Sequence, residues 1–359
     1  MPKPVRLIFK IFNVFISLGI IVSGLILGGT LYFNSPPSGP SALALAQAQN
    51  PNPPDNTMRL DQSGALILEV RGGESAQSVG RRLENAGIIR SQYFWNILSR
   101  VSGEHIRAGT YRIELPASQL QIRSVLTAGQ QILVRVTIPE GLTLRQTADI
   151  LHDAGVTRAE DFLAVATSRA MLDVFNIPGQ TMEGYLFPDT YLFPLAYPAQ
   201  RVISAMAGNF FRRLAQVAPE SVHISPQELH ERVIMASIVE REYRVREEAA
   251  LMAGVFYHRL RIGMLLQSCA TVVYVMTEIQ GRPHPQRLFY RDLEIQNPFN
   301  TYMYRGLPPA PIASPGETAL AAAFRPIQTD YLFFRVSDPV EGRHIFTRTL
   351  AEHNAAGIR

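Results

Sequence analysis

The chain has 359 residues, of which 47% are hydrophobic and 18% are charged, and its formal net charge is +4. This length allows a membrane anchor followed by one or two globular units with sizeable cores. The basic residues are scattered, which argues against the dense Lys/Arg surface of a nucleic-acid-binding protein. The single cysteine, Cys269, excludes an intrachain disulfide, and no Cys/His spacing resembles a zinc site. We expect Cys269 to be a small buried side chain.

The N-terminal segment predicts a membrane anchor. Lys3, Arg6 and Lys10 precede an uncharged stretch over residues 11–33, which is longer than the ~20 residues that a spanning helix needs. Because a cleavable signal peptide has a shorter apolar core, we interpret this stretch as an uncleaved anchor. The positive charges precede the span, so residues 1–10 are expected in the cytoplasm and the body outside the membrane. A buried core helix is the alternative, and the apolar composition on all sides disfavours it.

Residues 34–62 predict a linker. The segment carries several prolines between Pro36 and Pro54, with Ser, Ala, Gln and Asn, and it has almost no apolar periodicity. Such a composition cannot bury a core, so we expect an extended, mobile spacer.

An internal duplication occupies residues 63–158. Val70–Ile89 and Ile138–Val156 match at one constant offset, with Gly73 paired to Gly141. Each copy follows a β-rich run and continues as a Gly turn, a Ser or Thr N-cap, an amphipathic helix and an Ala-Gly stop. The copies resemble the βα unit of LysM-type carbohydrate-binding modules, although any strand–turn–helix unit shares this pattern.

The segment Glu183–Pro194, EGYLFPDTYLFP, places aromatic residues on both sides of Pro188. Proline cannot donate within a central strand, so an edge or turn segment is expected. The aromatic rings either pack in the core, which we favour, or present their faces to sugar rings.

The helix predicted after Ser225 contains the strongest candidate for catalysis. Ser225-Pro226-Gln227-Glu228 fits a capping box with proline at the first helical position. At ~100° per residue, Glu240 continues the apolar stripe formed by Leu229, Val233 and Ala236. A carboxyl group in apolar surroundings stays protonated near neutral pH, as a general acid must. The alternative is a structural salt bridge to Arg259 or Arg261.

A second catalytic carboxylate is not evident. Glu242 lies ~200° around the same helix from Glu240, so the two would not share a face. Asp189, Glu183 and Asp292 are further candidates, and no spacing selects one of them. Residues 297–315 are rich in Asn, Tyr and Pro and predict a fixed loop able to bind polyol groups.

Several motifs occur in a fixed order: IPEGLT, EGYLFPDTY, ASIVERE, VFYHRLRIGMLLQS, NTY, GLPPAPIASPG, YLFFRV and FTRTLAEHN. Together they resemble the YceG-like endolytic murein transglycosylases (the MltG family). The resemblance implies a single-pass protein of the cytoplasmic (inner) membrane, with a LysM-like region and a catalytic domain on the periplasmic face. It implies cleavage of the β-1,4 bond between N-acetylmuramic acid and N-acetylglucosamine in nascent strands, with 1,6-anhydro-muramyl ends, and work beside peptidoglycan synthases.

The resemblance also implies site residues. The family's catalytic glutamate lies in the ASIVE motif, which matches Glu240, and no metal or cofactor is needed. Polar family positions match Gln267, Thr271, Asn300 and Tyr302, which we assign to substrate binding. The chain departs from the family where Cys269-Ala270 replaces an acidic residue and proline, and where His258 replaces Asn.

These inferences predict an α+β protein with an N-terminal transmembrane helix, LysM-like βα modules at 63–158 and a mixed α/β catalytic domain at 159–359. Two other functions stay open. One is a non-catalytic peptidoglycan-binding anchor, and the other is a hydrolase that uses a second carboxylate. The mass of the products separates them, because hydrolysis adds one water that the anhydro products lack.

Overall fold

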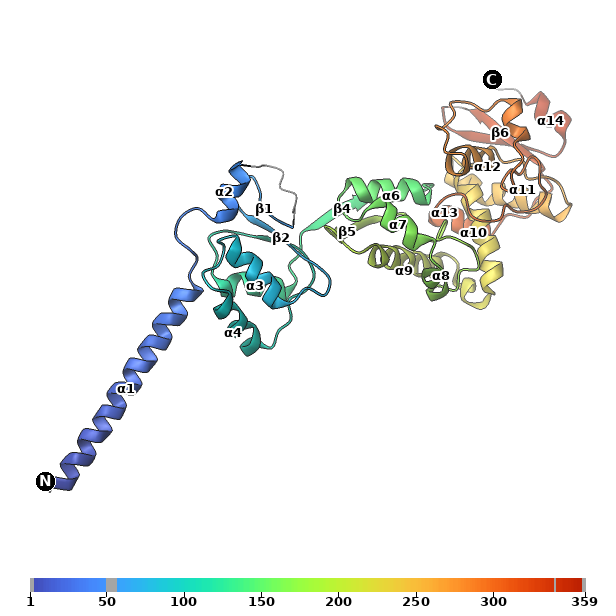
Figure 1. Cartoon of the computed structure of the whole chain (residues 1–359). Helices are drawn as coiled ribbons and strands as arrows, with labels where there is room; N and C mark the ends of the chain where they lie inside the picture. The colour runs from blue at the N-terminus through green and yellow to red at the C-terminus, as the bar shows by residue number, and fades with distance from the viewer. Residues whose placement is uncertain (1–2, 50–56, 339, 357–359) are drawn as a thin grey trace. The chain divides into compact units, whose positions relative to one another are not determined.

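The computed structural model describes residues 3–49, 57–338 and 340–356. The chain divides into two compact units, Met1–Leu133 and Val134–Arg359 (Figure 1). The predicted mixed α/β content is confirmed. The boundary between the units lies before the second copy of the repeat, whereas the sequence predicts it after that copy. The reason is that strand β4 (Leu133–Thr137) pairs with strand β5 (Thr190–Pro194) from the C-terminal part of the chain.

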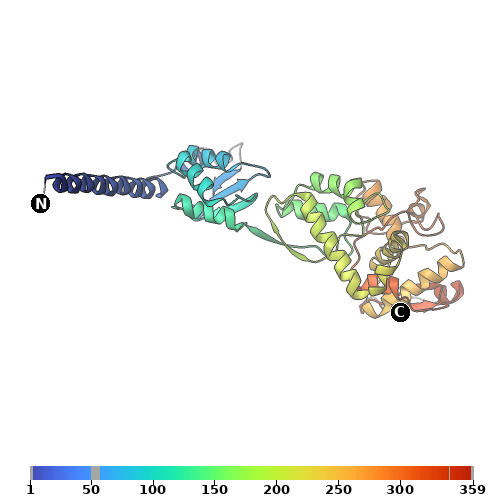
Figure 2. The same ribbon diagram turned by 90° about the horizontal axis from the view of Figure 1, so that it is seen from below.

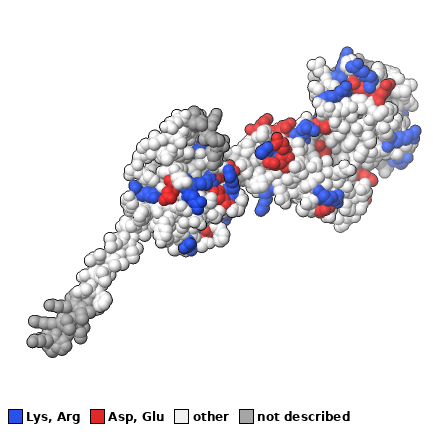
Figure 3. Space-filling model, viewed as in Figure 1, with Lys and Arg blue, Asp and Glu red and all other residues white. Residues whose placement is uncertain are grey.

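Helix α1 (Lys3–Asn34) begins the first unit. Its stretch Val14–Asn34 is long and apolar enough to cross a membrane, and none of it is buried by protein. Figure 3 shows no charged group on the part of α1 that is not drawn in grey. A soluble core helix would be covered by other elements, so this helix is consistent with the predicted membrane span over residues 11–33.

The folded part of the first unit is a three-stranded antiparallel sheet with helices packed against it. The strand order is β1 (Met58–Leu60), β2 (Leu66–Val70) and β3 (Gly109–Ile113), with Leu66 opposite Ile113. The helices are α3 (Ala76–Asn85), α4 (Gln92–Ser102) and α5 (Gln119–Ala128). Their fully buried side chains, together with those of the strands, form a separate core around Trp95 and Tyr111.

Part of the predicted linker is folded. Helix α2 (Ala42–Gln49) lies within it, and the Gln47 side chain bonds both the N–H and the C=O of Leu60 at 2.8 Å. The Gln47 amide thus makes the two hydrogen bonds that the backbone of a neighbouring strand would make with β1. The linker composition lacks apolar periodicity, but single apolar residues also attach it: Met58 belongs to the core of this unit, and Leu43 and Leu60 pack against that core. Residues 50–56 of the predicted spacer lie outside the described residues.

The two copies of the repeat have the same local structure. Ser75 and Thr143 are the N-caps of α3 and of α6 (Leu144–Asp153), as predicted, and each hydroxyl accepts from the N–H three residues on. Gly73 and Gly141 have φ values of 79° and 77°, a conformation that favours glycine. The duplication is therefore real at the level of backbone geometry, although the copies belong to different units.

The second unit is built mainly from helices around one core. Helix α10 (Pro226–Glu240) packs against α11 (Ala249–Arg261) and α13 (Glu317–Phe324). Every residue from Val233 to Val239 is buried, so the second half of α10 is central and has no polar face, whereas Gln227, Glu228 and Glu231 in its first half are exposed. The other helices of the unit are α7 (Ala159–Ala166), α8 (Arg169–Val174), α9 (Ala199–Val217), α12 (Cys269–Tyr274) and α14 (Leu350–Ala355).

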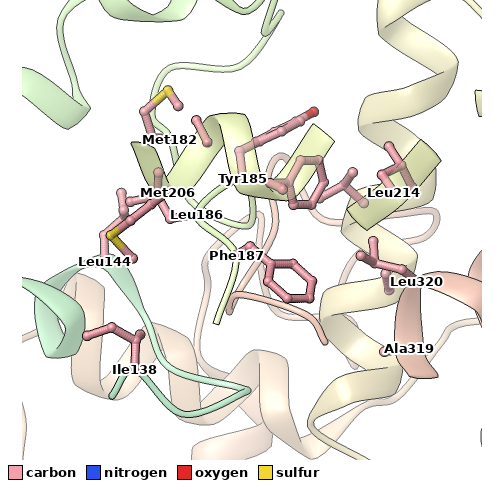
Figure 4. Close-up of a cluster of buried hydrophobic side chains, with 14 of the residues drawn as sticks. Ile138, Leu144, Met182, Tyr185, Leu186, Phe187, Met206, Leu214, Ala319 and Leu320 are labelled. Atoms are coloured by element: carbon pink, nitrogen blue, oxygen red, sulfur yellow. The ribbon is translucent and has the colours of Figure 1, made fainter. Parts of the chain in front are cut away.

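The aromatic segment after Glu183 packs into this core. Tyr185 and Phe187 are 1% and 4% exposed, and Phe193 is 4% exposed, which confirms the packing interpretation. Figure 4 shows Tyr185 and Phe187 among Leu214, Leu320 and other buried side chains from several elements. The Tyr185 and Phe193 rings are therefore not available to bind a sugar.

A C-terminal hairpin completes the unit. Strands β6 (Phe333–Asp338) and β7 (Arg343–Thr347) pair antiparallel and lie beside α11 in both views (Figures 1 and 2). The Phe256 and Phe334 rings meet edge to face, with centroids 5.5 Å apart. The imidazole Nδ1 of His344 lies 2.8 Å from a Glu248 oxygen, which fastens the hairpin to the segment before α11.

Candidate active site

A pocket of about 290 Å³ lies at the end of α10, where the chain segments before α11 and α12 meet the C-terminal hairpin. Its walls combine aromatic rings with a carboxyl, an amide, a thiol, a phenol and an imidazole. Such a mixture of apolar walls and a few polar groups is typical of sites for small ligands. The lining residues are Glu242, Phe256, Arg259, Leu266, Gln267, Cys269, Tyr302, Phe333, Phe334, Leu350 and His353.

Glu242 is the carboxyl group of this pocket. Helix α10 ends at Glu240, so Glu242 stands two residues beyond the last helical turn. Its carboxylate accepts hydrogen bonds from the Ser268 hydroxyl, at 2.5 Å, and from the Ala270 backbone N–H. Burial raises the pKa of Glu242 above its usual value, and these two hydrogen bonds partly oppose the shift. The protonated form of Glu242 is therefore more favoured than that of a free carboxyl group.

Glu240 has a different environment. The residue is half-buried, and its carboxylate accepts from the N–H of Gly316, the N-cap of α13, at 2.9 Å. Burial raises the pKa of Glu240 to about 7; the Gly316 hydrogen bond opposes this shift and the nearby Glu140 adds to it. Glu240 does not line the 290 Å³ pocket.

The salt bridge that the sequence leaves open for Glu240 is not formed among the described residues. The Arg259 guanidinium donates instead to the backbone carbonyls of Leu332 and Leu266, at 2.6 and 2.7 Å. It also lies over the Phe333 ring, 5.2 Å from the centroid. Arg259 is thus a buried support of the pocket wall rather than an ion-pair partner of Glu240, and its charge favours the ionised form of Glu242.

Two of the four predicted substrate-binding residues line the pocket. Gln267 and Tyr302 are both part of its wall, together with Glu242. Gln267 has a φ of 52°, which is uncommon for a residue with a side chain and costs ~1–3 kcal/mol. Strain of this kind is frequent at functional sites.

The other two predicted binding residues have structural roles. Thr271 and Asn300 are fully buried, so a sugar cannot reach them in this structure. The Thr271 hydroxyl donates to the Ser268 carbonyl at 2.7 Å. The Asn300 amide donates to the carbonyls of Leu293 and Ile295, at 2.9 and 2.8 Å. Both residues fix the loops that carry Gln267 and Tyr302. Assigning them to direct substrate contact is therefore a prediction that the geometry does not support.

The prediction that Cys269 is buried is wrong. Its side chain is exposed, lines the pocket and lies 3.1 Å from the Tyr302 hydroxyl, measured from Sγ. The reason is that Cys269 is the first residue of α12, on the side of the helix start that faces the pocket.

The three further carboxylates considered from the sequence lie outside this pocket. Glu183 is 3% exposed and accepts from the Leu144 N–H at the start of α6. Asp189 pairs with Arg213 at 3.2 Å, and Asp292 accepts from the Phe289 N–H at 2.8 Å. Asp189 borders a second pocket of about 210 Å³, which is also lined by Glu140, Phe187, Pro188, Arg213, Arg246, Glu317 and Thr318.

The described residues contain no group of three His, Cys, Asp or Glu side chains suited to a metal ion. The 290 Å³ pocket offers one carboxyl group with polar and aromatic neighbours. One carboxyl can act first as an acid and then as a base, provided that the substrate supplies its own nucleophile.

The sequence profile of the YceG-like family matches residues 68–358, so the chain belongs to that family. The endolytic murein transglycosylase of Bacillus subtilis is 29% identical over 82% of this chain and 85% of its own length. The endolytic murein transglycosylase of Streptococcus pneumoniae strain D39 is 26% identical over 80% of this chain, which spans 57% of that relative. A crystal structure of a putative yceG-like protein from Listeria monocytogenes shares 28% identity and a TM-score of 0.55, over 82% of this chain and 99% of that one.

Sequence reasoning did not select Glu242 or His353 as pocket residues. It treated Glu242 as a continuation of α10, whereas the helix ends at Glu240. The segment REYRVREE is polar and contains no apolar periodicity. That polarity is the signal that could have indicated a turn before Glu242.

Proposed function

We propose that this chain cuts peptidoglycan glycan strands internally, at the β-1,4 bond between N-acetylmuramic acid and N-acetylglucosamine. The lytic transglycosylase class predicted from the sequence is confirmed by the curated relatives of that name. The bond that is cut and the 1,6-anhydro-muramyl product belong to the proposal. They rest on the motifs that resemble the family and on a pocket that holds a single carboxyl group.

One observation carries the choice of the acid/base. Gln267 and Tyr302, which the family resemblance assigns to substrate binding, line the same pocket as Glu242. We therefore propose Glu242 as the proton donor and acceptor. Glu240, which the sequence predicts for this role, stays the alternative, because its pKa is also raised, to about 7.

The proposed mechanism uses the carboxyl group twice. Protonated Glu242 donates its proton to the glycosidic oxygen while the bond from that oxygen to the muramyl C1 breaks through an oxocarbenium-like state. The carboxylate that results then takes the proton of the muramyl C6 hydroxyl, and the C6 oxygen bonds to C1. Because this nucleophile belongs to the same sugar, its effective concentration is high, up to ~10⁵ M or more. A second catalytic carboxylate is then unnecessary.

The test compares three glutamine variants of the full-length chain on purified glycan strands. Glu242→Gln should abolish release of anhydro-muramyl products, with a loss of at least ~100-fold, because general acid–base catalysis is worth ~10²–10⁴-fold. Glu240→Gln should retain most of the activity. Glu247→Gln, an exposed position in the turn before α11, is the matched control. Mass spectrometry identifies the products.

The reverse result, an active Glu242→Gln chain and an inactive Glu240→Gln chain, would return the role to Glu240. Products that contain one additional water would identify a hydrolase. An unsubstituted chain that binds strands without cutting them would favour the non-catalytic binding protein. Each outcome thus corresponds to one of the functions that the sequence leaves open.

The location outside the cytoplasm is also proposed. The apolar stretch of α1 and the preceding Lys3, Arg6 and Lys10 support a single-pass protein with its body on the outer face of the cytoplasmic membrane. Peptidoglycan synthases, which the family resemblance implies as partners, are on that face. Protease added to intact spheroplasts should digest the body of the chain. Protection of the body would contradict this orientation.

The LysM-like assignment is a proposal for the first copy of the repeat, β2 and α3. It is supported by the shared strand, glycine turn and capped helix of both copies. Insoluble peptidoglycan should sediment the full-length Glu242→Gln chain. If Gly73→Val does not weaken this sedimentation, the first copy does not bind glycan.

A further inference from the structure

The end of α1 packs against the folded part of the first unit. The Phe33 ring lies 6.3 Å from the Phe94 ring of α4, measured between centroids. The Gln119 amide of α5 donates to the Phe33 carbonyl at 2.9 Å, and the Leu120 N–H donates to the Asn34 side-chain oxygen at 3.0 Å. The last turn of α1 therefore contacts the starts of two helices of the folded part.

The segment that follows α1 is attached as well. The Arg90 guanidinium donates to the Ser35 carbonyl at 3.2 Å and lies over the Tyr32 ring, 4.7 Å from its centroid. The Leu43 N–H donates to the Ala86 carbonyl at 3.0 Å. Direct contacts thus join the apolar helix to the folded part, so a membrane that holds α1 also fixes how the folded part lies on it.

The length of the apolar helix places these contacts at the membrane surface. The stretch Val14–Asn34 has 21 residues. At ~1.5 Å per residue it spans ~31 Å, which matches the ~30 Å hydrocarbon core of a bilayer. With α1 across the membrane, its last turn lies where acyl chains meet headgroups. The contact between Phe33 and Phe94 brings the start of α4 to the same level.

Helix α4 carries an apolar stripe on the side that faces away from the protein core. Tyr93, Ile97 and Val101 are 77%, 39% and 82% exposed. They are four residues apart, so at ~100° per residue they lie within ~80° of one another around the helix. The buried Trp95 lies ~160° from the middle of this stripe. Helix α4 is therefore apolar both towards the core and towards its surroundings.

The neighbouring helix α3 has the opposite character on its outer side. Its exposed residues include Gln77, Arg81 and Glu84, as expected for a helix that faces water. A contiguous apolar stripe such as that of α4 marks a surface that meets another molecule or a membrane. Arg100, which is exposed in the last turn of α4, adjoins the stripe and can bind a lipid phosphate.

We propose that α4 lies in the surface of the membrane that holds α1, with the stripe of Tyr93, Ile97 and Val101 where headgroups meet acyl chains. A tyrosine with two aliphatic neighbours and an adjacent arginine suits this zone, because the apolar parts enter the lipid while the polar ends reach the headgroups. Continuity with the end of α1 selects the bilayer as the partner. The inference rests on the proposed membrane location of α1 and is separate from the proposed cleavage of glycan strands.

The experiment measures the depth of α4 in vesicles of phosphatidylethanolamine and phosphatidylglycerol. The full-length Cys269→Ser chain has no other cysteine, so a single introduced cysteine carries an environment-sensitive fluorophore. The variants are Val101→Cys, Leu25→Cys within the apolar stretch of α1, and Val222→Cys at a 68% exposed valine of the second unit. Lipids with a nitroxide near the headgroup or deep in the acyl chain quench each label according to its depth.

The label at Val101 should be quenched mainly by the shallow nitroxide, at a depth of ~5–10 Å into the boundary between headgroups and acyl chains. The label at Leu25 should be quenched mainly by the deep nitroxide, and the label at Val222 by neither. An added Ile97→Asp should reduce quenching at Val101 to the level seen at Val222, because a charge in the stripe opposes its entry into lipid. Val174→Asp, at an exposed valine of α8, is the matched control and should leave that quenching unchanged.

Quenching at Leu25 without quenching at Val101 would overturn the inference and leave the membrane anchor standing. Quenching at neither position would overturn the anchor and the inference together. Unchanged quenching at Val101 in the Ile97→Asp chain would show that attachment to α1 alone brings α4 near lipid, which removes the role of the stripe. An emission shift at Val101 that depends on protein density, without quenching by nitroxide lipids, would assign the stripe to a second copy of the chain instead.

Discussion

The burial of Glu183 leads to a quantitative prediction about stability and pH. Its side chain lies beneath the start of α6, where both carboxyl oxygens are 3.1 Å from the Leu144 N–H. Burial raises the pKa of Glu183 to about 8; the Leu144 hydrogen bond opposes this shift and the nearby Glu278 adds to it. The folded chain therefore holds a proton on Glu183 that the unfolded chain releases above its ordinary pKa of 4.5.

The pH dependence of the unfolding free energy follows from the difference between the folded and the unfolded pKa of Glu183. The folded pKa is raised, so the stabilising contribution is complete below about pH 4.5 and is lost as the pH rises towards about 8. Each pH unit in that window removes ~1.4 kcal/mol. Between about pH 5 and pH 7.5, Glu183 alone should lower the free energy of unfolding of the second unit by roughly 3 kcal/mol. Glu183→Gln keeps an acceptor for Leu144 and has no proton to lose, so this part of the pH dependence should disappear.

Pulse proteolysis in graded urea measures the effect, with peptides from residues 140–200 as the readout for the second unit. The difference in unfolding free energy between Glu183→Gln and the unsubstituted chain should increase by roughly 3 kcal/mol from about pH 5 to pH 7.5. Glu231→Gln, at an exposed position of α10, is the matched control. The same pH dependence in all three chains would refute the reasoning, because Glu183 would then be ionised in the folded state.

Three further substitutions test other parts of the structure. Ser268→Ala removes a hydrogen-bond donor that favours the ionised form of Glu242. The pKa of Glu242 should therefore rise, so the alkaline limb of the pH–rate profile should move to higher pH, with a roughly tenfold loss of kcat. If the alkaline limb does not move, Glu242 is not the catalytic acid. Gly254→Ala would place a Cβ 2.0 Å from the Ile327 carbonyl oxygen, a backbone atom, and should destabilise the second unit by at least ~1–3 kcal/mol in the same proteolysis assay. Thr143→Ala removes the N-cap of α6 and should cost ~1 kcal/mol, whereas an unchanged stability would mean that water replaces the cap.

Local structure was predictable where the sequence carries a short-range signal. The N-caps Ser75, Thr143 and Ser225 are all at the predicted positions, because each hydroxyl bonds an N–H only three residues away. The sequence Ser314-Pro315-Gly316-Glu317 likewise predicts a helix start with Ser314 as the N-cap. The structure instead begins the helix after Gly316, whose N–H donates to Glu240 rather than to a local cap.

The arrangement of the site was less predictable. The helical-wheel argument for Glu240 assumes one apolar stripe, but α10 is buried on all sides from Val233 to Val239. In a central helix, the position of a residue around the axis says little about its role. The predicted angle of ~200° between Glu240 and Glu242 around the helix axis also does not hold, because the helix ends before Glu242. The family resemblance assigns Gln267 and Tyr302 to substrate binding, and the fold brings both residues to Glu242 from separate loops.

The position of the hairpin has a consequence for the assembly of the pocket. The pocket around Glu242 takes Phe333 from β6 and takes Leu350 and His353 from α14, far along the chain from α10 and α11. During synthesis, α10 and α11 are therefore made before this wall exists. The pocket is complete only once β6, β7 and α14 have been made and have packed against the rest of the second unit.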